Sequence, residues 1–345
     1  MDRCAVVLLN YNGLHLLKKF IPLVIRYSEG CTIYVADNKS TDRSIEWLKT
    51  HHQEVIIIQN SFNAGFSKGY NLALQQVKAE YFVLLNTDVE VSPGWIHPIL
   101  KFMDERAEIA ACQPKILSYH EKNKFEYAGA AGGYIDILGY PFCRGRIFNT
   151  LEEDHGQYDD TRQVFWATGA CFIVRASIFK EVGGFDDDFF AHMEEIDLCW
   201  RLQRAGYQIW YFGLSKVFHI GGGTLPKINP RKTYLNFRNS LTMIAKNTPA
   251  SQLIWKLPLR LTMDSLAALK FFMSDSFYNF KAVMIAIKDF FGAYAKARQA
   301  IVNKSARLKI RNEDYLVYKS LIVVDYFIRK RKKFSDLKFK SPKWC

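Results

Sequence analysis

Three acidic side chains stand within four positions of the stretch HMEEIDLCWRLQRAGY, where the spacing of apolar residues predicts the start of a helix. Glu194, Glu195 and Asp197 would lie in its first turn, and acids there complement the positive end of the helix dipole. Three acids exceed this need, and Phe189 and Phe190 place apolar surface just before them. A carboxylate near an apolar wall can act as a general base, so at least one of these acids is predicted to be catalytic.

A fourth carboxylate, Asp88, ends the polar stretch Asn86-Thr87-Asp88 that follows the apolar run YFVLL. This aspartate could cap a turn, hold a metal ion or have no chemical role. Mg²⁺ takes only one or two protein carboxylates when phosphate and water complete its shell, so one aspartate beside a phosphate site is enough. His219 ends another apolar run, just before three glycines. On its chemistry alone it is equally a structural residue or a ligand.

Polar residues end each of four short apolar runs in the first 90 residues, and stretches with helical spacing separate the runs. This alternation predicts a parallel sheet with helices on both faces. The carboxyl ends of such strands form the ligand crevice of open α/β sheets. Asn and Asp also populate turns, but four polar strand ends in succession predict one shared site. These ends are Asn10 to Asn12, Asp37-Asn38, Asn60 to Asn63 and Asn86 to Asp88.

Two of these strand ends have features of a nucleotide site. Residues 40–42, Ser-Thr-Asp, suit the cap of the following helix, whereas Asp37 lies earlier and can accept a hydrogen bond from a nucleobase N–H. Gly65 and Gly69 let the backbone approach a ligand, and a helix starting near Lys68 would direct its N-terminus at phosphate. The stretch lacks the GK[ST] of a Walker loop and also lacks GxGxxG.

The composition indicates a folded globular protein. The chain has 345 residues, 49% of them hydrophobic, which is enough for one large core or two domains. Its mean hydropathy is close to zero, and it has no run of about 18 uncharged apolar residues, so no transmembrane helix is expected. The N-terminus lacks the pattern of a signal peptide. Seven dispersed cysteines without a CxxC pair indicate reduced thiols in the cytosol and disfavour a zinc site.

Positive charge is concentrated in the last third of the chain. Residues 226–345 hold 25 of the 47 Lys and Arg but only 7 of the 34 Asp and Glu, a balance of +18, whereas residues 1–225 carry −5. Apolar residues at helical spacing, with Lys and Arg between them, predict helices over 231–247 and 252–300. We therefore expect two domains, 1–225 and 226–345, the second basic, amphipathic and suited to an anionic membrane surface. Residues 91–165, which contain several glycines, are expected to be a loop-rich insertion.

Seven motifs occur in the order seen in family-2 glycosyltransferases, and the sequence resembles the bacterial rhamnosyltransferase-like branch of that family over residues 3–225. The motifs are VVLLNYNG, VADNKSTDRS, NAGFSKGYNLAL, YFVLLNTDVEVSPGW, GACFIVRASIFKEVGGFDDDFF, HMEEIDLCWRLQRAGY and VFHIGGGT. This branch builds cell-surface polysaccharides. The resemblance implies a GT-A fold, a nucleotide-diphosphate sugar donor, a divalent metal (Mg²⁺ or Mn²⁺) and inversion at the anomeric carbon. It also implies a glycan or a polyprenyl-diphosphate-linked acceptor.

The resemblance also assigns a role to each candidate residue. For the donor, Asn10 and Asn12 would line the nucleotide pocket, Asp37 would bind the nucleobase, and Asn63, Gly65 and Asn71 would shape the diphosphate and sugar pocket. Asp88, aided by His219, would ligate the metal, and Trp166, Gly169 and Ala170 would border the donor sugar and acceptor. Glu195 would be the catalytic base, with Glu194 and Asp197 shaping the acceptor site. Relatives often have Asp-x-Asp where this chain has Asn86-Thr87-Asp88. They often have Glu-Asp where it has Glu194-Glu195.

Two other classes of protein remain open. A sugar nucleotidyltransferase also binds nucleotides at strand ends, but it usually has a Gly-rich, Arg-bearing loop after the first strand, where this chain has NYNGLHLLKKF. A non-enzymatic basic protein could bind nucleic acid through the tail RKRKKFSDLKFKSPKW, although acidic strand ends would repel phosphate. We expect a cytoplasmic enzyme on the inner face of the membrane, with no nucleic-acid partner. The basic helices could instead simply pack on the sheet.

Overall fold

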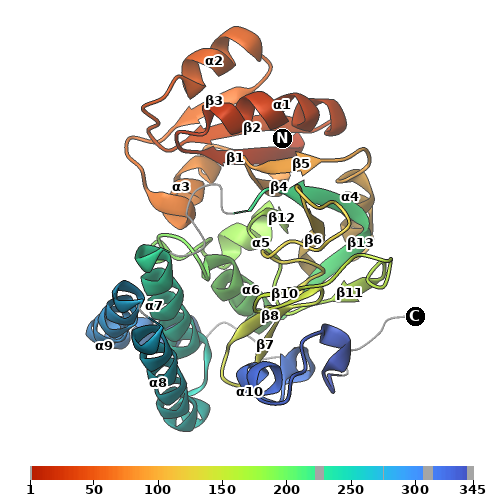
Figure 1. Cartoon of the computed structure of the whole chain (residues 1–345). Coiled ribbons are helices and arrows are strands. Elements are labelled where there is room, and N and C mark those ends of the chain that lie inside the picture. The colour runs from red at the N-terminus through yellow and green to blue at the C-terminus, as the bar shows by residue number, and fades with distance from the viewer. Residues whose placement is uncertain (1, 222–228, 275, 306–313, 340–345) are drawn as a thin grey trace.

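The computed structural model describes residues 2–221, 229–274, 276–305 and 314–339 (Figure 1). Its first part alternates strands and helices: β1 (Asp2–Asn10), α1 (Leu14–Tyr27), β2 (Thr32–Asp37), α2 (Ser44–His51), β3 (Ile56–Gln59), α3 (Gly65–Leu74) and β4 (Ala79–Asn86). β1 pairs in parallel with β2 and β4, and β2 pairs in parallel with β3, which confirms the predicted parallel sheet here. α3 begins earlier than Lys68, because Phe66 and Tyr70 pack as one helical face with ring centroids 4.8 Å apart.

Further strands extend the sheet on the β4 side. These strands and the helices between them are β5 (Val89–Val91), α4 (His97–Asp104), β6 (Ile109–Ser118), β11 (Thr161–Gln163), β12 (Cys171–Arg175), α5 (Ala176–Glu181), α6 (Glu194–Arg204) and β13 (Gln208–His219). The strand order is β11-β13-β6-β12-β4-β1-β2-β3, with β5 paired to β13. β12 runs antiparallel to β4 and β6, whereas β13 runs parallel to β6. The sheet is therefore mixed, with its parallel strands around β1.

Helices cover both faces of the sheet, and alternate residues of β1 divide between two cores. Val6 and Leu8 pack with residues of α1, α2 and α4 on one face. Ala5 and Val7 pack with residues of α3, α5 and α6 on the other. A strand that is buried on both faces reads as a continuous apolar run, as AVVLL does. The doubly wound arrangement expected from the sequence is therefore confirmed.

Residues 91–165 are more regular than the expected loop-rich insertion. They supply β6, a ten-residue strand inside the main sheet that is buried along nearly its whole length. Pro114 conceals this strand in the sequence, because proline is rare within central strands. In the structure, the register between β13 and β6 shifts beside Pro114, between Phe212 and Lys216, as at a β-bulge.

The same segment builds most of a second sheet, whose order is β10-β9-β8-β7-β14. Its strands are β7 (Gly133–Asp136), β8 (Pro141–Cys143), β9 (Arg146–Ile147), β10 (Thr150–Leu151) and β14 (Val317–Tyr318). β14 comes from near the end of the chain and pairs in parallel with β7. The C-terminal segment is thus part of a sheet that begins within the preceding domain.

The basic C-terminal region is helical, as predicted. Its helices are α7 (Pro230–Asn247), α8 (Ala250–Met273), α9 (Phe277–Ser305) and α10 (Ile322–Phe327), with 3₁₀ turns at Asp314–Leu316 and Phe334–Asp336. The single helix expected over 252–300 is two helices, because Ser276 begins the second by accepting the backbone N–H bonds of Asn279 and Phe280. Figure 1 shows α7, α8 and α9 as one bundle beside α6. Within the described ranges, no helix combines the length and apolarity that a membrane crossing requires.

Candidate active site

The polar strand ends meet at one edge of the main sheet, as predicted. Asn10 on β1 lies beside Asp37 on β2, and its side-chain amide donates a 2.9 Å hydrogen bond to the Asp37 carboxylate. On the other side of β1, Leu9 is paired with Asn86 of β4. The Asn86 backbone N–H donates to the carbonyl oxygen of Ala170, 3.0 Å away, just before β12 begins. Antiparallel β12 therefore starts where β1, β2 and β4 end.

Asn10, Asn12 and Asp37 hold the loop that follows β2. Asn10 and Asp37 are buried, and the Asp37 carboxylate accepts the backbone N–H of Ser40 at 2.9 Å. Asn12 is exposed, and its side-chain oxygen accepts the backbone N–H of Thr41 at 2.7 Å. Asn12 has a φ of 53°, in the left-handed region that asparagine tolerates better than most residues. The predicted nucleotide residues are thus brought together, with Asn12 and the backbone of 40–42 at the surface.

Two asparagines that belong to the predicted polar strand ends, but had no individual role assigned, position the start of α3. Asn38 donates to the Gly65 carbonyl oxygen at 2.8 Å, and Asn60 donates to the Asn38 side-chain oxygen at 2.8 Å. Gly65 has a φ of 73°, and a Cβ atom there would lie 2.5 Å from the Phe190 carbonyl oxygen. Only glycine fits this close approach. The strand-end asparagines could have been found from the sequence, because they belong to the same polar ends.

Asn63 and Asn71 shape the loops on either side of this approach. The Asn63 side-chain oxygen accepts the Gly65 backbone N–H at 3.1 Å. The Asn71 amide donates to the Phe185 carbonyl oxygen at 2.9 Å and to Asp187 at 2.7 Å. These bonds fasten α3 to the segment that leads into α6. Both asparagines therefore organise the backbone at the start of α3, where the diphosphate and sugar pocket is predicted.

Asp88 and His219 lie together, although 131 positions separate them in the sequence. His219 Nε2 is 3.1 Å from Asp88 Oδ1, and His219 Nδ1 is 3.1 Å from Glu126 Oε2, with all three side chains buried. Burial would lower the His219 pKa, but the two carboxylates raise it to about 10. Burial would also raise the pKa of Asp88 and of Glu126, but the partner histidine holds both below their usual range. Glu126 gave no sequence signal, because it stands alone in an irregular segment.

The donor atoms of Asp88 and His219 fit a divalent cation that phosphate also binds. Carboxylate oxygen and neutral imidazole are both metal ligands, and binding would take the proton from His219 Nε2. Glu126 would then orient the ring from the Nδ1 side, as second-layer carboxylates do at metal sites. Across the described ranges, no cluster of three or more His, Cys, Asp or Glu suited to a metal is present. A metal here would therefore need ligands from a bound molecule.

Glu194 and Glu195 begin α6 next to a strained turn, with Glu194 buried and Glu195 half-buried. The two residues before them, His192 and Met193, both have left-handed backbones, with φ of 70° and 71°. Each glutamate has one carboxylate oxygen without water contact or a hydrogen-bond partner. Burial raises the pKa of Glu195 to about 7. Burial and then the neighbouring Glu195 charge raise the pKa of Glu194 well above its usual range. Near neutral pH, Glu195 can therefore take up a proton, and the raised pKa of Glu194 favours its protonated form.

The segment 166–170 lies against these glutamates. The Gly169 backbone N–H donates to the Glu195 carboxylate. A Cβ on Gly169 would lie 3.0 Å from the Phe66 ring, so α3 also reaches this point. Trp166 is almost fully buried, and its ring N–H donates to the Tyr134 carbonyl oxygen at 3.0 Å. Gly169 contacts Glu195, and the next residue, Ala170, accepts the backbone N–H of Asn86 at the end of β4. The segment 166–170 therefore connects the acidic pair to the strand ends.

Asp197 is placed differently from the other two acids. Its carboxylate is fully buried and accepts from Arg201 at 2.8 Å, Lys246 at 3.0 Å and Asn247 at 2.8 Å. Burial would raise the Asp197 pKa, but Lys246 and Arg201 lower it to about 2. Both carboxylate oxygens are therefore engaged in joining α6 to α7. Asp197 therefore anchors the helix rather than presenting a free carboxylate.

A second contact joins α7 to the turn before the glutamates. Asn239 is fully buried, and its amide donates to the carbonyl oxygens of Ala191, at 2.9 Å, and His192, at 2.7 Å. Arg238 donates to the Asp188 carbonyl oxygen at 2.8 Å. Sequence reasoning missed these residues, because nothing in an amphipathic helix marks which polar side chain turns inward.

Comparisons with known proteins identify the family and agree with the fold. Residues 5–183, more than half of the chain, match the family described as Glycosyl transferase family 2. The N-acetylglucosaminyl-diphospho-decaprenol L-rhamnosyltransferase of Mycobacterium tuberculosis (strain ATCC 25618 / H37Rv) is 25% identical over 285 residues, 78% of this chain and 92% of that protein. Rhamnosyltransferase WbbL of Escherichia coli (strain K12) is 24% identical over 221 residues, 62% of this chain and 82% of WbbL.

Solved structures share the fold at low identity. S. aureus TarS 1–349 in complex with UDP-GlcNAc aligns with a TM-score of 0.51 at 14% identity, over 87% of this chain and 83% of that chain. Mannosyltransferase PcManGT from Pyrobaculum calidifontis in complex with GDP-Man and Mn²⁺ aligns with a TM-score of 0.50 at 11% identity, over 88% and 79%. The family match decides against a nucleotidyltransferase and against a non-enzymatic nucleic-acid binder. The chain belongs to glycosyl transferase family 2 and is a glycosyltransferase with a GT-A fold.

Proposed function

We propose that this enzyme transfers a sugar from a nucleotide-diphosphate donor to a glycan or lipid-linked acceptor in bacterial cell-surface polysaccharide synthesis. The observation that carries the proposal is the Glu194–Glu195 pair, in which each glutamate has one buried carboxylate oxygen without a hydrogen-bond partner, at the edge where the polar strand ends meet. The relatives support the substrate class, since one of them acts on a decaprenol-linked diphosphate and is matched along 92% of its length.

The proposed reaction is a single displacement with inversion. Glu195 takes the proton from an acceptor hydroxyl, and the hydroxyl oxygen attacks the anomeric carbon of the donor sugar. The bond between that carbon and the diphosphate oxygen breaks, and the nucleoside diphosphate leaves with the bonding electrons. Glu194 keeps its proton and faces the acceptor side. Asp197 keeps α6 in place through its ion pairs, which is the role we now propose for it.

Asp88 and His219 are proposed to hold a divalent cation, Mg²⁺ or Mn²⁺, together with the donor diphosphate. When bound, such a cation supplies positive charge that stabilises the departing diphosphate. Asp37 and Asn12 are proposed to contact the nucleoside. The Asn10 side chain holds Asp37 in position by donating a hydrogen bond to its carboxylate. Asn63, Gly65 and Asn71 keep the backbone at the start of α3 free for the diphosphate, and Trp166 with Gly169 borders the sugar.

A panel of nucleotide-diphosphate sugars tests the proposed substrate class. We expect one donor to raise the melting temperature of the protein when Mn²⁺ or Mg²⁺ is present, because ligands that bind only the folded state stabilise it. Asp88→Asn should lose the metal-dependent part of the shift. Its unliganded melting temperature should fall by several degrees, because His219 loses one of its two buried carboxylate partners, so each shift is measured against the unliganded form of the same protein. Equal shifts with and without the metal in both proteins would contradict the metal assignment, and no shift with any donor would contradict the substrate class.

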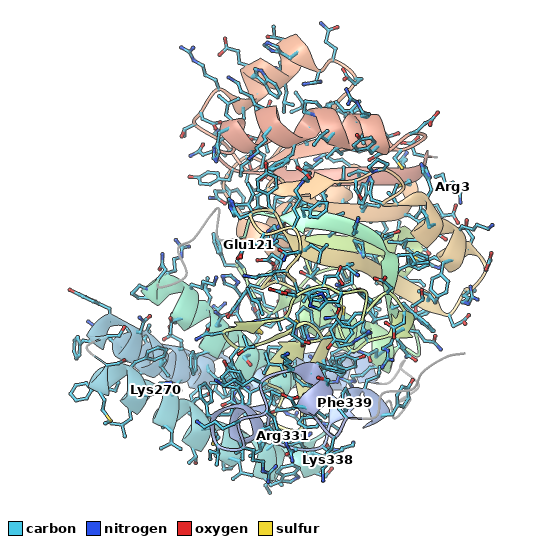
Figure 2. The ribbon with its side chains drawn as sticks, turned by 45° about the vertical axis from the view of Figure 1, so that its right-hand side comes forward. Arg3, Glu121, Lys270, Arg331, Lys338 and Phe339 are labelled. Carbon is cyan, nitrogen blue, oxygen red and sulfur yellow. The ribbon has the colours of Figure 1, made fainter. Side chains whose placement is uncertain are left out.

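The α8–α9 pair is proposed to rest on the inner face of the membrane. Large apolar side chains are exposed along it: Ile254, Trp255, Leu259, Leu266, Leu269, Phe272 and Met273 on α8, and Phe277, Tyr278, Met284, Ile285 and Phe291 on α9. Exposed lysines lie among them, and Figure 2 shows Lys270 on this bundle. Apolar and basic side chains together suit an anionic lipid surface. Residues such as Val283 and Phe290 are buried, so the same helices also pack on the protein.

Co-sedimentation with vesicles tests this placement. The full chain should bind vesicles of phosphatidylcholine with phosphatidylglycerol. Leu266→Asp/Leu269→Asp should weaken binding at least about tenfold, because each buried leucine contributes about 1.5–3 kcal/mol. Leu214→Asp is the matched control, since Leu214 is 74% exposed on β13, outside the bundle. If the control and the double variant bind equally, the α8–α9 surface is not the contact.

A further inference from the structure

The described C-terminal tail, residues 314–339, packs against the second sheet, which contains β7 and β14. β14 pairs with β7, and the backbone N–H of Ile322 donates to the buried Asp136 carboxylate at 3.0 Å. The Phe339 ring contacts the Tyr134 ring, with centroids 4.9 Å apart. Figure 2 shows Arg331, Lys338 and Phe339 together at the base of the molecule. The described part of this tail therefore has a fixed position.

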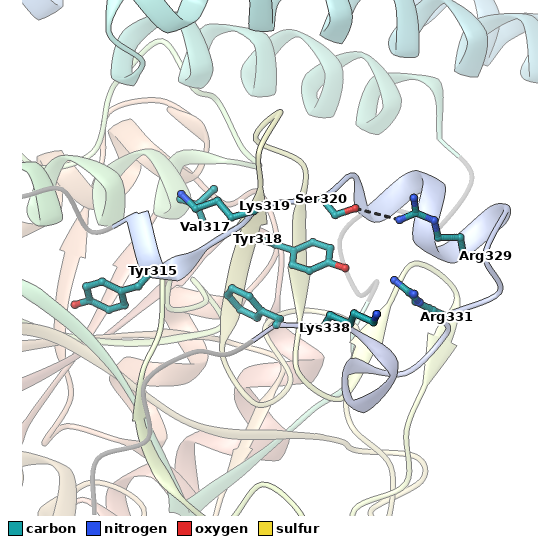
Figure 3. A pocket seen from close by; sticks show the side chains of 9 residues that line it. Tyr315, Val317, Tyr318, Lys319, Ser320, Arg329, Arg331 and Lys338 are labelled. Atoms are coloured by element: carbon teal, nitrogen blue, oxygen red, sulfur yellow. Dashed lines mark hydrogen bonds between the residues drawn. The ribbon is translucent and has the colours of Figure 1, made fainter.

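This fold creates a surface cavity of about 600 Å³, and the described residues that line it include no acidic side chain. Four of the nine lining residues are cationic and three are aromatic: Lys319, Arg329, Arg331 and Lys338, and Tyr315, Tyr318 and Phe339, with Val317 and Ser320 completing the wall. Figure 3 shows the ends of Arg329, Arg331 and Lys338 gathered around the Tyr318 hydroxyl, with Lys319 directed to the other side. Like charges repel, so this convergence is costly unless an anion lies between them.

One buried carboxylate fixes the two arginines but does not balance the cluster. Asp325 is fully buried and accepts from Arg331 at 2.7 Å, Arg329 at 3.2 Å and the Tyr318 hydroxyl at 2.8 Å. Each guanidinium has five N–H donors in a fixed plane, so most remain available after these bonds. Counting the described side chains alone, Arg329, Arg331 and Lys338 face one carboxylate, which leaves a net charge of +2. The arginines are therefore oriented in advance for a second anion.

We propose that this cavity binds the diphosphate group of an organic diphosphate, at a site separate from the donor site at Asp88. Guanidinium groups bind phosphate oxygens in pairs, and lysine adds a point charge. The cavity is larger than two phosphates need and lies within the range of ordinary ligand pockets. The aromatic side chains Tyr315 and Phe339 provide surface for the part of the ligand attached to the diphosphate. The proposal thereby assigns diphosphate binding to part of the basic C-terminal region.

Titration with inorganic diphosphate tests the proposal, using the full chain at low salt with EDTA so that no metal-mediated binding contributes. Arg329→Gln/Lys338→Gln should bind diphosphate at least about tenfold more weakly, because charge-assisted hydrogen bonds contribute about 1.5–3 kcal/mol. This variant keeps the Arg331–Asp325 pair. Arg26→Gln/Lys101→Gln removes the same charge from exposed positions on α1 and α4 and should bind within about twofold of the unchanged protein.

Asp88→Asn separates this site from the donor site. We expect it to bind diphosphate in EDTA as the unchanged protein does, whether or not Asp88 holds the donor. Displacement by UDP alone assigns the cavity to a nucleotide, and displacement by farnesyl diphosphate alone assigns it to a lipid-type diphosphate. The proposal fails if Arg329→Gln/Lys338→Gln binds normally, if neither compound displaces diphosphate, or if a mixed-sequence RNA binds more tightly than diphosphate at the same cluster.

Discussion

Replacing Glu195 with Gln should lower kcat by about 100- to 10,000-fold, the range that a general base contributes. Gln keeps the size of the side chain and can still accept from the Gly169 N–H, but it cannot take the acceptor proton. The affinity for the nucleotide-sugar donor should stay within about threefold, since the change lies on the acceptor side. Steady-state kinetics and calorimetric donor binding measure the two effects separately. Turnover near that of the unchanged enzyme would remove Glu195 from the mechanism.

Glu194→Gln is the matched control for this result. Burial and the neighbouring Glu195 charge raise the Glu194 pKa, which favours the protonated form, and Gln resembles that form. We expect its kcat to stay within about fivefold of the unchanged enzyme. Glu195→Asp should retain part of the activity, since it keeps the carboxylate. If Glu194→Gln causes the larger loss, the two glutamates have exchanged roles.

The pH dependence of kcat/KM is a second test of Glu195 as the general base. Only ionised Glu195 can accept a proton, so activity should rise with pH and reach half its plateau near pH 7, where burial has placed the Glu195 pKa. An ordinary exposed glutamate would place this limb near pH 4.3. The limb should be absent from the residual activity of Glu195→Gln.

The sequence predicted the parts of the site that depend on strand ends. A parallel strand buried on both faces must be apolar until it leaves the sheet, so Asn10, Asp37 and Asp88 stood out at the points where polarity begins. The common edge then followed from topology, because parallel strands end on the same side. The acid pair of α6 was visible for a similar reason, since it exceeds what the start of a helix needs.

The parts that were missed depend on contacts between distant segments. Glu126 meets His219 only because β6 crosses the sheet, and Pro114 concealed that strand. Asp197 looked like its neighbours in the sequence, and only Lys246, 49 positions later, reveals its structural use. The excess of Lys and Arg near the cation cluster could be read from the sequence, but the role of buried Asp325 in orienting Arg329 and Arg331 could not. Local pattern identifies which residues leave the core but not which partners they meet.

Replacing Asn239 with Ala should lower kcat by about tenfold to 100-fold while donor KM changes little. The Asn239 amide supports two carbonyl oxygens in the turn that holds His192 and Met193 in left-handed conformations. Such conformations cost about 1–3 kcal/mol each and persist only when their surroundings enforce them. Each tenfold change in rate corresponds to about 1.4 kcal/mol, so relaxation of this turn is sufficient to produce the loss.

The pH at which kcat/KM reaches half its plateau distinguishes a role of Asn239 in positioning Glu195 from a general loss of stability. If the turn relaxes, Glu195 gains access to water, its pKa falls toward its ordinary value, and the half-plateau of kcat/KM moves below pH 7. Ser240→Ala is the control, because Ser240 is buried on the same helix with no partner for its hydroxyl, and its removal should leave both kcat and the limb unchanged. A lower melting temperature with an unmoved limb in Asn239→Ala would mean that α7 stabilises the fold without setting the base. A moved limb would make α7, which lies beyond the family match at residues 5–183, part of the catalytic apparatus.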